Sequence, residues 1–269
     1  MFSGDLSVTC GELQEGRNAL GLDIRYDRTM DITSTQGFIA TLHAATRLRP
    51  GSGALAAPVC SSFVYMSRGS SGRTVCEPMG NLSHESVRTG NYIAVRTLIV
   101  LIVVAALQCW TILEQPKNSI MELHPAFQQY LSMVQCWRAH IQMRDYGGPT
   151  AKPTWLYSNR RMIGELHEFR PLSLPAPTEP IEMVVRYTDS SGRSKIKGGR
   201  HLKQSQSYPK GFGKALARLR SRHAALLKRE AECQLKADVA TFRSIARNTH
   251  ADAQWIQWAN LQPILDYLM

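Results

Sequence analysis

Short apolar runs that end in polar, turn-forming residues recur along the first 160 positions of the chain. Leu55–Val59 follows a Gly-Ser-Gly turn and leads to Cys60, and Cys109–Leu113 leads to Glu114. Runs of this length, bounded by turn signals, are typical of buried strands. We therefore expect Cys60 and Glu114 at the carboxyl ends of two strands, where open α/β sheets place their ligands.

Further strands and helices are predicted around these two runs, from apolar runs, alternation or helical spacing of apolar residues. The expected strands are Ala19–Ile24, Met30–Ile32, Gln135–Met143 and Thr154–Tyr157, and the expected helices are 34–48, 125–133 and 213–247. Strands that alternate with helices indicate an α/β sheet.

Tyr92–Leu113 is the most apolar part of the chain, and its uninterrupted run is Thr97–Leu107. That run is nearer the length of a buried helix than the roughly 20 residues that span a bilayer. We expect a helix over about 91–105 that packs on the sheet. A membrane-associated protein built on residues 92–113 is the alternative.

The chain of 269 residues has room for one sizeable domain and an appendage. Its six cysteines lack paired spacing, and the sequence starts without a charged-then-apolar leader. Both features favour free thiols and an intracellular protein, nuclear or cytoplasmic. Cys136 and His140 form the one close Cys/His couple, which is too little for zinc. We expect no metal site.

The net charge of +11 is unevenly placed along the sequence. Residues 1–185 hold 16 Lys/Arg against 15 Asp/Glu, whereas residues 186–247 hold 16 against 4. This division suits a near-neutral body with a polyanion-binding tail. A solvated basic helix without a partner is the alternative.

The two strand ends resemble motifs of the C5-cytosine DNA methyltransferases, which use S-adenosylmethionine. Pro58-Val59-Cys60 resembles their Pro-Cys nucleophile motif, with valine where the family has proline, and Glu114-Gln115-Pro116 resembles their Glu-Asn-Val motif. The resemblance implies that Cys60 attacks C6 of a cytosine while Glu114 holds a ring nitrogen.

The same resemblance assigns cofactor contacts to the front of the chain. Phe2-Ser3-Gly4 resembles the start of the family's glycine loop, although Leu6 stands at its second glycine. Asp23 is implied to bind the ribose and Asp31 the adenine, and Pro58 borders the cofactor. Each aspartate could instead cap a turn or helix.

Tyr146-Gly147-Gly148-Pro149 resembles the family's Tyr-Gly-x-Pro segment, after which a basic residue helps to fix the base. Lys152 stands in that place, and a Gly-Pro hairpin with an exposed lysine is the other interpretation. Positive charge near Cys60, from Arg68, Arg73 or Lys152, would favour the thiolate. The residues expected to contact nucleic acid, with DNA as the implied partner, are Arg68, Arg73, Lys214, Arg218 and Arg222.

The resemblance covers residues 2–159 and implies a Rossmann-like class I methyltransferase sheet that lacks most of its first strand. We therefore divide the chain into a methyltransferase-like α/β domain (1–159), a Pro-rich then basic flexible linker (160–211) and a basic, mainly helical extension (212–269). Three functions follow: cytosine methylation, nucleic-acid binding by a degenerate methyltransferase fold, or membrane association.

Overall fold

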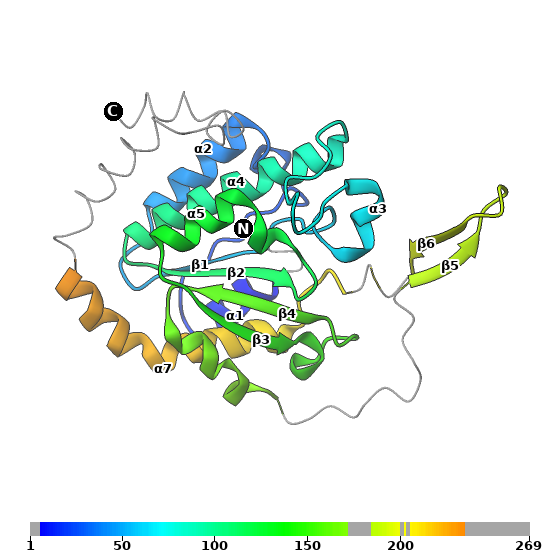
Figure 1. Ribbon diagram of the computed structural model, residues 1–269. Helices are drawn as coiled ribbons and strands as arrows, with labels where there is room; N and C mark the ends of the chain where they lie inside the picture. The colour runs from blue at the N-terminus through cyan, green and yellow to red at the C-terminus, as the bar shows by residue number, and fades with distance from the viewer. Residues whose placement is uncertain (1–5, 172–183, 200–201, 203–204, 235–269) are drawn as a thin grey trace.

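A four-stranded mixed sheet forms the centre of the structure. The computed structural model describes residues 6–171, 184–199, 202 and 205–234. The strand order is β1-β2-β4-β3, with β1 parallel to β2 and β4 antiparallel to both of its neighbours (Figure 1). The strands are β1 (Gly53–Ala56), β2 (Trp110–Pro116), β3 (Trp137–Gln142) and β4 (Pro153–Ser158). The predicted mixed α/β class is confirmed.

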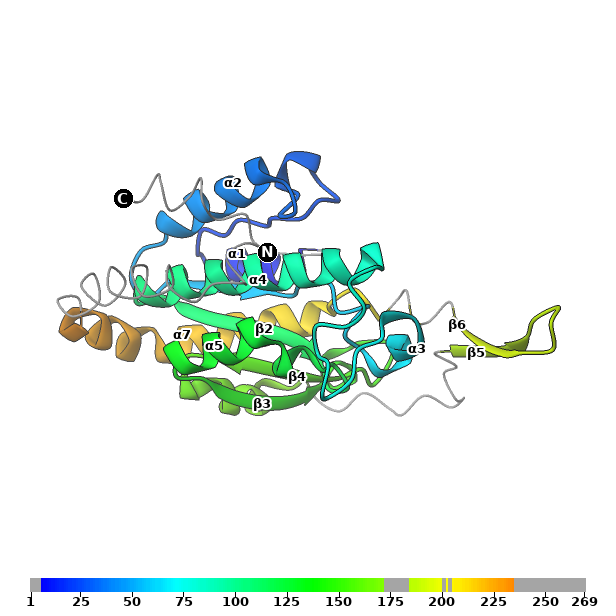
Figure 2. The ribbon, with the colours of Figure 1, turned by 45° about the horizontal axis from the view of Figure 1, so that its top comes forward.

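Helices cover both faces of this sheet (Figure 2). One hydrophobic cluster joins the sheet to α2 (Thr35–Thr46), α4 (Glu85–Ala106) and α5 (Pro125–Met133). A second cluster joins the opposite face to η5 (Arg161–Phe169) and α7 (Lys210–Gln234). Because β2 lies between these two clusters, six of its seven residues are buried.

The apolar segment predicted to be a buried helix is α4, which runs through the first cluster. By length and composition α4 could cross a membrane, but 61% of its most apolar window is buried inside the body. Its one interior charge, Arg96, is fully buried and donates hydrogen bonds to the backbone oxygens of Ile32 and Ser34. A paired arginine is compatible with a protein core.

The predicted early strands Ala19–Ile24 and Met30–Ile32 are wrong. The chain instead turns three times, and the carboxylates of Asp23, Asp27 and Asp31 each accept a hydrogen bond from the backbone N–H two residues later. Such local bonds compete with strand pairing. One 3₁₀ turn, η1 (Arg28–Met30), lies between Asp27 and Asp31, and within the described residues the sheet begins at β1.

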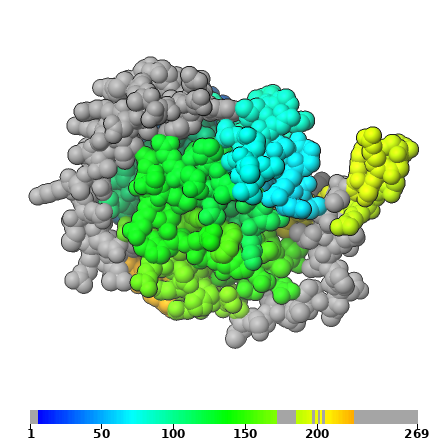
Figure 3. Space-filling view, viewed as in Figure 1, coloured from blue at the N-terminus to red at the C-terminus, as the bar shows by residue number. Residues whose placement is uncertain are grey.

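Residues 184–198, expected to belong to a flexible linker, form a β-hairpin instead. Its strands are β5 (Val184–Thr188) and β6 (Ser194–Gly198), joined by a turn in which Gly192 has φ +78°. Lys195 and Asp189 pair across its end at 2.8 Å. The hairpin stands clear of the body (Figure 3).

The first half of α7 packs on the sheet, with Phe212, Leu216 and Leu219 buried. α1 (Ser7–Gln14) crosses this half of α7 so closely that a Cβ at Gly213 would overlap the backbone oxygen of Ser7. The start of the basic helix is therefore part of the core. The rest of the predicted helical extension, residues 235–269, lies outside the described residues.

Candidate functional site

The sheet brings three sequence-predicted residues, Cys60, Glu114 and Lys152, to one edge. Because β1 and β2 are parallel, Cys60, four residues beyond β1, lies at the same edge as the end of β2 that carries Glu114. β4 runs the other way, and Lys152 directly precedes its first residue. Antiparallel pairing therefore places Lys152 beside the end of β2.

Lys152 and Glu114 form an ion pair, with 3.2 Å between Nζ and Oε1. Their side chains are 16% and 5% exposed, so both charges are largely withdrawn from water. Lys152 has φ +32°, a left-handed conformation that side chains other than glycine adopt rarely. The turn before β4 thus holds the ammonium against the carboxylate at a conformational cost.

Glu114 Oε1 is a buried acceptor with no hydrogen bond of regular geometry among the described residues. A buried carboxylate oxygen normally accepts at least one such bond, because an unmatched polar atom is costly to bury. The contact with Lys152 supplies charge but leaves a directed N–H donor missing. This oxygen is therefore the atom at which a ligand donor would be stabilised most.

Tyr208 is a fourth member of the cluster, and sequence reasoning missed it. It is 6% exposed and precedes α7, and the Lys152 ammonium lies 5.1 Å from its ring centroid. Burial and the Glu114 charge raise its pKa well above the ordinary value. Tyr208 lies in a Gly/Ser/Lys/Arg-rich stretch, and no local pattern marks it as part of a site.

Cys60 is a thiol rather than a thiolate at neutral pH. Burial and the Glu114 charge raise its pKa to about 11, and Lys152 opposes them only in part. Lys152 favours the thiolate, as expected of a nearby cation, but burial and Glu114 outweigh it. A ligand that compensates the Glu114 charge would lower the pKa of Cys60, although burial, the larger cause, would still raise it.

Arg73 does not face a nucleic acid, so that prediction is wrong. It is fully buried, its guanidinium lies 3.7 Å from the ring centroid of Phe63, and it donates to Ser62 Oγ and the Val87 oxygen. Burial lowers its pKa to about 10. Arg73 thus fixes the loop that follows Cys60, while Arg68 stacks on the Tyr65 ring at 4.5 Å.

The three predicted contacts on α7 have different surroundings. Lys214 and Arg218 are exposed. Arg222 is paired with Glu168 and Glu165, and its guanidinium lies 4.3 Å from the ring centroid of Phe169. A phosphate would compete with two carboxylates for Arg222, so Lys214 and Arg218 are the better candidates.

Of the residues assigned to S-adenosylmethionine, the structure describes Asp23, Asp31 and Pro58. Phe2, Ser3 and Gly4 lie outside the described residues. Asp23 accepts a hydrogen bond from the Arg25 backbone, and Asp31 accepts bonds from the backbone and hydroxyl of Thr33. Both carboxylates serve local turns, the alternative considered above. Pro58 is buried, and its carbonyl accepts a 3.4 Å bond from Gln115 Nε2.

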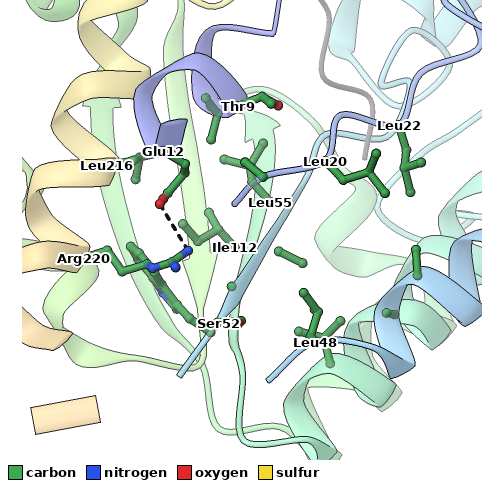
Figure 4. Close-up of a pocket in the computed structure, with 18 of the residues that line it drawn as sticks. Thr9, Glu12, Leu20, Leu22, Leu48, Ser52, Leu55, Ile112, Leu216 and Arg220 are labelled. Atoms are coloured by element: carbon green, nitrogen blue, oxygen red, sulfur yellow. Dashed lines mark ion pairs between the residues drawn. The ribbon is translucent and has the colours of Figure 1, made fainter. Parts of the chain in front are cut away.

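A cavity of about 190 Å³ lies along the outer edge of β1 (Figure 4). Pockets for drug-sized ligands span roughly 300–1,000 Å³, so this cavity is small for a nucleoside joined to an amino acid. Tyr208 is among the residues that line it, whereas Cys60, Glu114 and Lys152 are not.

Among the described residues, no group of three or more His, Cys, Asp or Glu side chains is placed to hold a metal ion. Comparisons with protein-family models, curated proteins and solved structures gave no match. Functional inference therefore depends on the site itself.

Proposed function

We propose that this chain is a methyltransferase-like, nucleic-acid-binding protein whose Cys60–Glu114–Lys152 cluster receives a pyrimidine base. The observation that carries the proposal is the buried Glu114 Oε1, which lacks a regular donor while a thiol and an ammonium lie at the same sheet edge. Glu114 comes from β2, and Cys60 and Lys152 come from the segments after β1 and before β4. The resemblance to C5-cytosine methyltransferases implies the same three roles.

The chemistry is addition of the thiol to an electron-poor ring. The Cys60 sulfur forms a bond to C6, the C5–C6 double bond is lost, and its electrons move through the ring towards N3. The thiol proton leaves through Glu114, which delivers a proton to N3. No oxidant or reductant is needed. A base in a duplex must first leave the stack to reach such a site.

Base binding would also lower the raised pKa of Cys60. The Glu114 charge contributes to the raised pKa. When the N4 amino group of cytosine donates to Oε1, that negative charge is partly compensated and the thiol ionises more readily. The proposal therefore links the reactivity of Cys60 to base binding. Without a bound base, the Cys60 thiol is protonated and unreactive.

Binding of an oligonucleotide tests the proposal. The probe is single-stranded DNA with one cytosine among adenines, whose N4 amino group can donate to Glu114, compared with the same strand carrying an abasic site, by fluorescence anisotropy. We expect the base to tighten binding by about tenfold through one buried charge-assisted bond. Glu114→Gln should remove this difference and Cys76→Ser should keep it. Equal affinity for both strands would reject base binding at the cluster.

Methyl transfer is the activity that the resemblance implies, with S-adenosylmethionine as cofactor. The two aspartates assigned to it serve local turns, so no step through the cofactor is derived. Calorimetry of S-adenosylmethionine with the full chain, with Asp23→Ala as control, tests this part. Saturable binding that Asp23→Ala abolishes would support an enzyme, and absence of binding by the folded chain would reject one.

Nucleic-acid binding without covalent chemistry is the second candidate function. The protonated state of Cys60 and the local turn bonds of the two aspartates assigned to the cofactor favour it. It predicts that Lys214 and Arg218 bind DNA with an affinity that does not depend on the base. Membrane association through residues 92–113 stays a prediction, which carbonate-resistant fractionation tests.

A further inference from the structure

The cavity beside β1 has one charged end and one apolar end (Figure 4). Its apolar end is formed by Leu20, Leu22 and Leu48, which come from the segment after α1 and from the end of α2. At the other end the side chains of Glu12 and Arg220 point toward each other, from α1 and α7. The cavity is thus amphipathic, as small-ligand sites usually are.

The charged end carries an excess of positive charge. Arg220 Nη1 lies 3.3 Å from Glu12 Oε2, and Arg17 pairs with the same Glu12 oxygen. Arg17 is occupied further, since it donates to Ser221 Oγ and to the Ala217 carbonyl. One carboxylate therefore serves two guanidinium groups, of which Arg220 lines the cavity.

The guanidinium of Arg220 is largely buried, so water solvates its charge poorly. Its side chain is 16% exposed, and burial followed by the neighbouring Arg17 lowers its pKa. Among the described residues, Glu12 is the one carboxylate in ion-pair contact with Arg220. A guanidinium has five N–H donors in a planar fork, so contact through Nη1 leaves donors for a second anion.

The volume limits the size of the ligand. At the packing density of protein interiors, about 0.75, a cavity of 190 Å³ holds a van der Waals volume of about 140 Å³. This corresponds to roughly ten non-hydrogen atoms, since a 150 Å³ apolar cavity accepts benzene with room to spare. A nucleotide or a peptide would not fit entirely inside the cavity beside β1.

We propose that this cavity binds a small apolar monocarboxylate, with its carboxylate on Arg220 and its hydrocarbon body against Leu20, Leu22 and Leu48. A carboxylate matches the guanidinium fork and balances the second arginine. The hydrocarbon body displaces water from the surfaces of these three leucines. The site is distinct from the proposed pyrimidine-binding cluster, since Cys60, Glu114 and Lys152 do not line the cavity.

Calorimetry with the full chain tests the proposal, and 3-phenylpropionate is the probe. 3-Phenylpropanamide has the same shape without the charge, and 3-phenylpropylamine carries the opposite charge. We expect one saturable site for the carboxylate, at least about tenfold weaker binding of the amide, and no binding of the amine. Equal binding of carboxylate and amide would overturn the proposal, as would absence of carboxylate binding.

Variants locate the binding within the cavity. Arg220→Gln should weaken the carboxylate about tenfold or more, whereas Arg218→Gln, an exposed arginine on the same helix, should leave affinity unchanged. Ala44→Leu adds volume to the cavity wall at a helical position that tolerates leucine, and should abolish binding even if Arg220→Gln proves unstable. Unchanged affinity in Ala44→Leu would place the ligand elsewhere and reject this site.

Discussion

The Lys152 ammonium lies 3.2 Å from Glu114 Oε1, yet this buried carboxylate oxygen has no regular hydrogen-bond donor among the described residues. The pair therefore combines attraction between charges with an unmatched acceptor. Because Cys60 feels both charges, the pair also controls the protonation of the thiol. The site is poised for a ligand that brings an N–H group to Oε1.

The first prediction concerns the reactivity of Cys60. Its pKa of about 11 is raised by burial and by Glu114 and lowered by Lys152. Glu114→Gln should therefore speed alkylation of Cys60 at pH 8–10 severalfold, and Lys152→Met should slow it. The measurement is the iodoacetamide alkylation rate of the Cys60 peptide by mass spectrometry, with the exposed Cys76 as a reference in the same sample. Slower alkylation in Glu114→Gln would contradict the assigned charge effects.

The second prediction concerns stability in acid. Burial, followed by the charge of Arg73, lowers the pKa of His124 from 6.5 to about 4. The unfolded chain therefore binds more protons than the folded one between these pH values, and the His124 contribution falls as pH drops, by at most about 1.4 kcal/mol per pH unit. Urea unfolding at pH 4.5 to 7.5 measures this dependence.

His124→Asn is the matched variant, because His124 Nδ1 accepts a bond from the Ala126 backbone at the start of α5 and asparagine can cap a helix in the same way. The wild-type chain should lose more stability than His124→Asn between pH 6.5 and 4.5. Parallel pH profiles of the two proteins would show that His124 does not contribute.

The third prediction concerns the crossing of α1 and α7. Gly213→Ala would place a Cβ against the Ser7 backbone, which can yield only if the helices separate, and should lower the free energy of unfolding by about 1–3 kcal/mol. Gly69→Ala, with open space around the added carbon, should change it by less than about 0.5 kcal/mol. Urea denaturation measures both, and equal stabilities would mean that α1 does not cross at this glycine.

The fourth prediction concerns the salt dependence of duplex DNA binding. If Lys214 and Arg218 each contact a phosphate, the double variant Lys214→Ala/Arg218→Ala should reduce the slope of log K against log salt by about 2. Arg222→Ala should change it less, because Arg222 is already paired with Glu165 and Glu168. Titrations from 50 to 200 mM salt supply the slopes. A larger effect of Arg222→Ala would refute this ranking.

Sequence patterns identified the second half of the sheet well because its signals are local. The helix 125–133 has a proline at its first position and its observed bounds are Pro125–Met133. The alternation in 135–143 gave β3, and the Gly-Pro-rich turn gave the start of β4. In each case the spacing of apolar residues, or a local turn signal, predicts the element.

The front of the chain was misread because local hydrogen bonds outweigh its apolar character. Asp23 and Asp31 each bond to their own turn, an interaction that composition does not distinguish from a strand end. Arg73 was also misassigned, since a cation in a Gly/Ser-rich loop reads as exposed, whereas here the Phe63 ring and backbone oxygens satisfy it.

The candidate site was predictable in part. Cys60, Glu114 and Lys152 follow from strand ends and from the resemblance, because parallel and antiparallel pairing fixes where those ends meet. Tyr208 is 56 residues from Lys152 and reaches the cluster through the packing of α7. Only the tertiary arrangement reveals that contact.

The central claim is that the cluster receives a pyrimidine, and covalent trapping tests it most directly. The full chain is incubated with DNA containing 2-pyrimidinone, which is electron-poor at C6, and the products are digested and mapped by mass spectrometry. The account predicts an adduct on the Cys60 peptide that is absent in Cys60→Ser, retained in Cys76→Ser and strongly reduced in Glu114→Gln. An adduct on another cysteine, or none on a chain that binds the DNA, would contradict it.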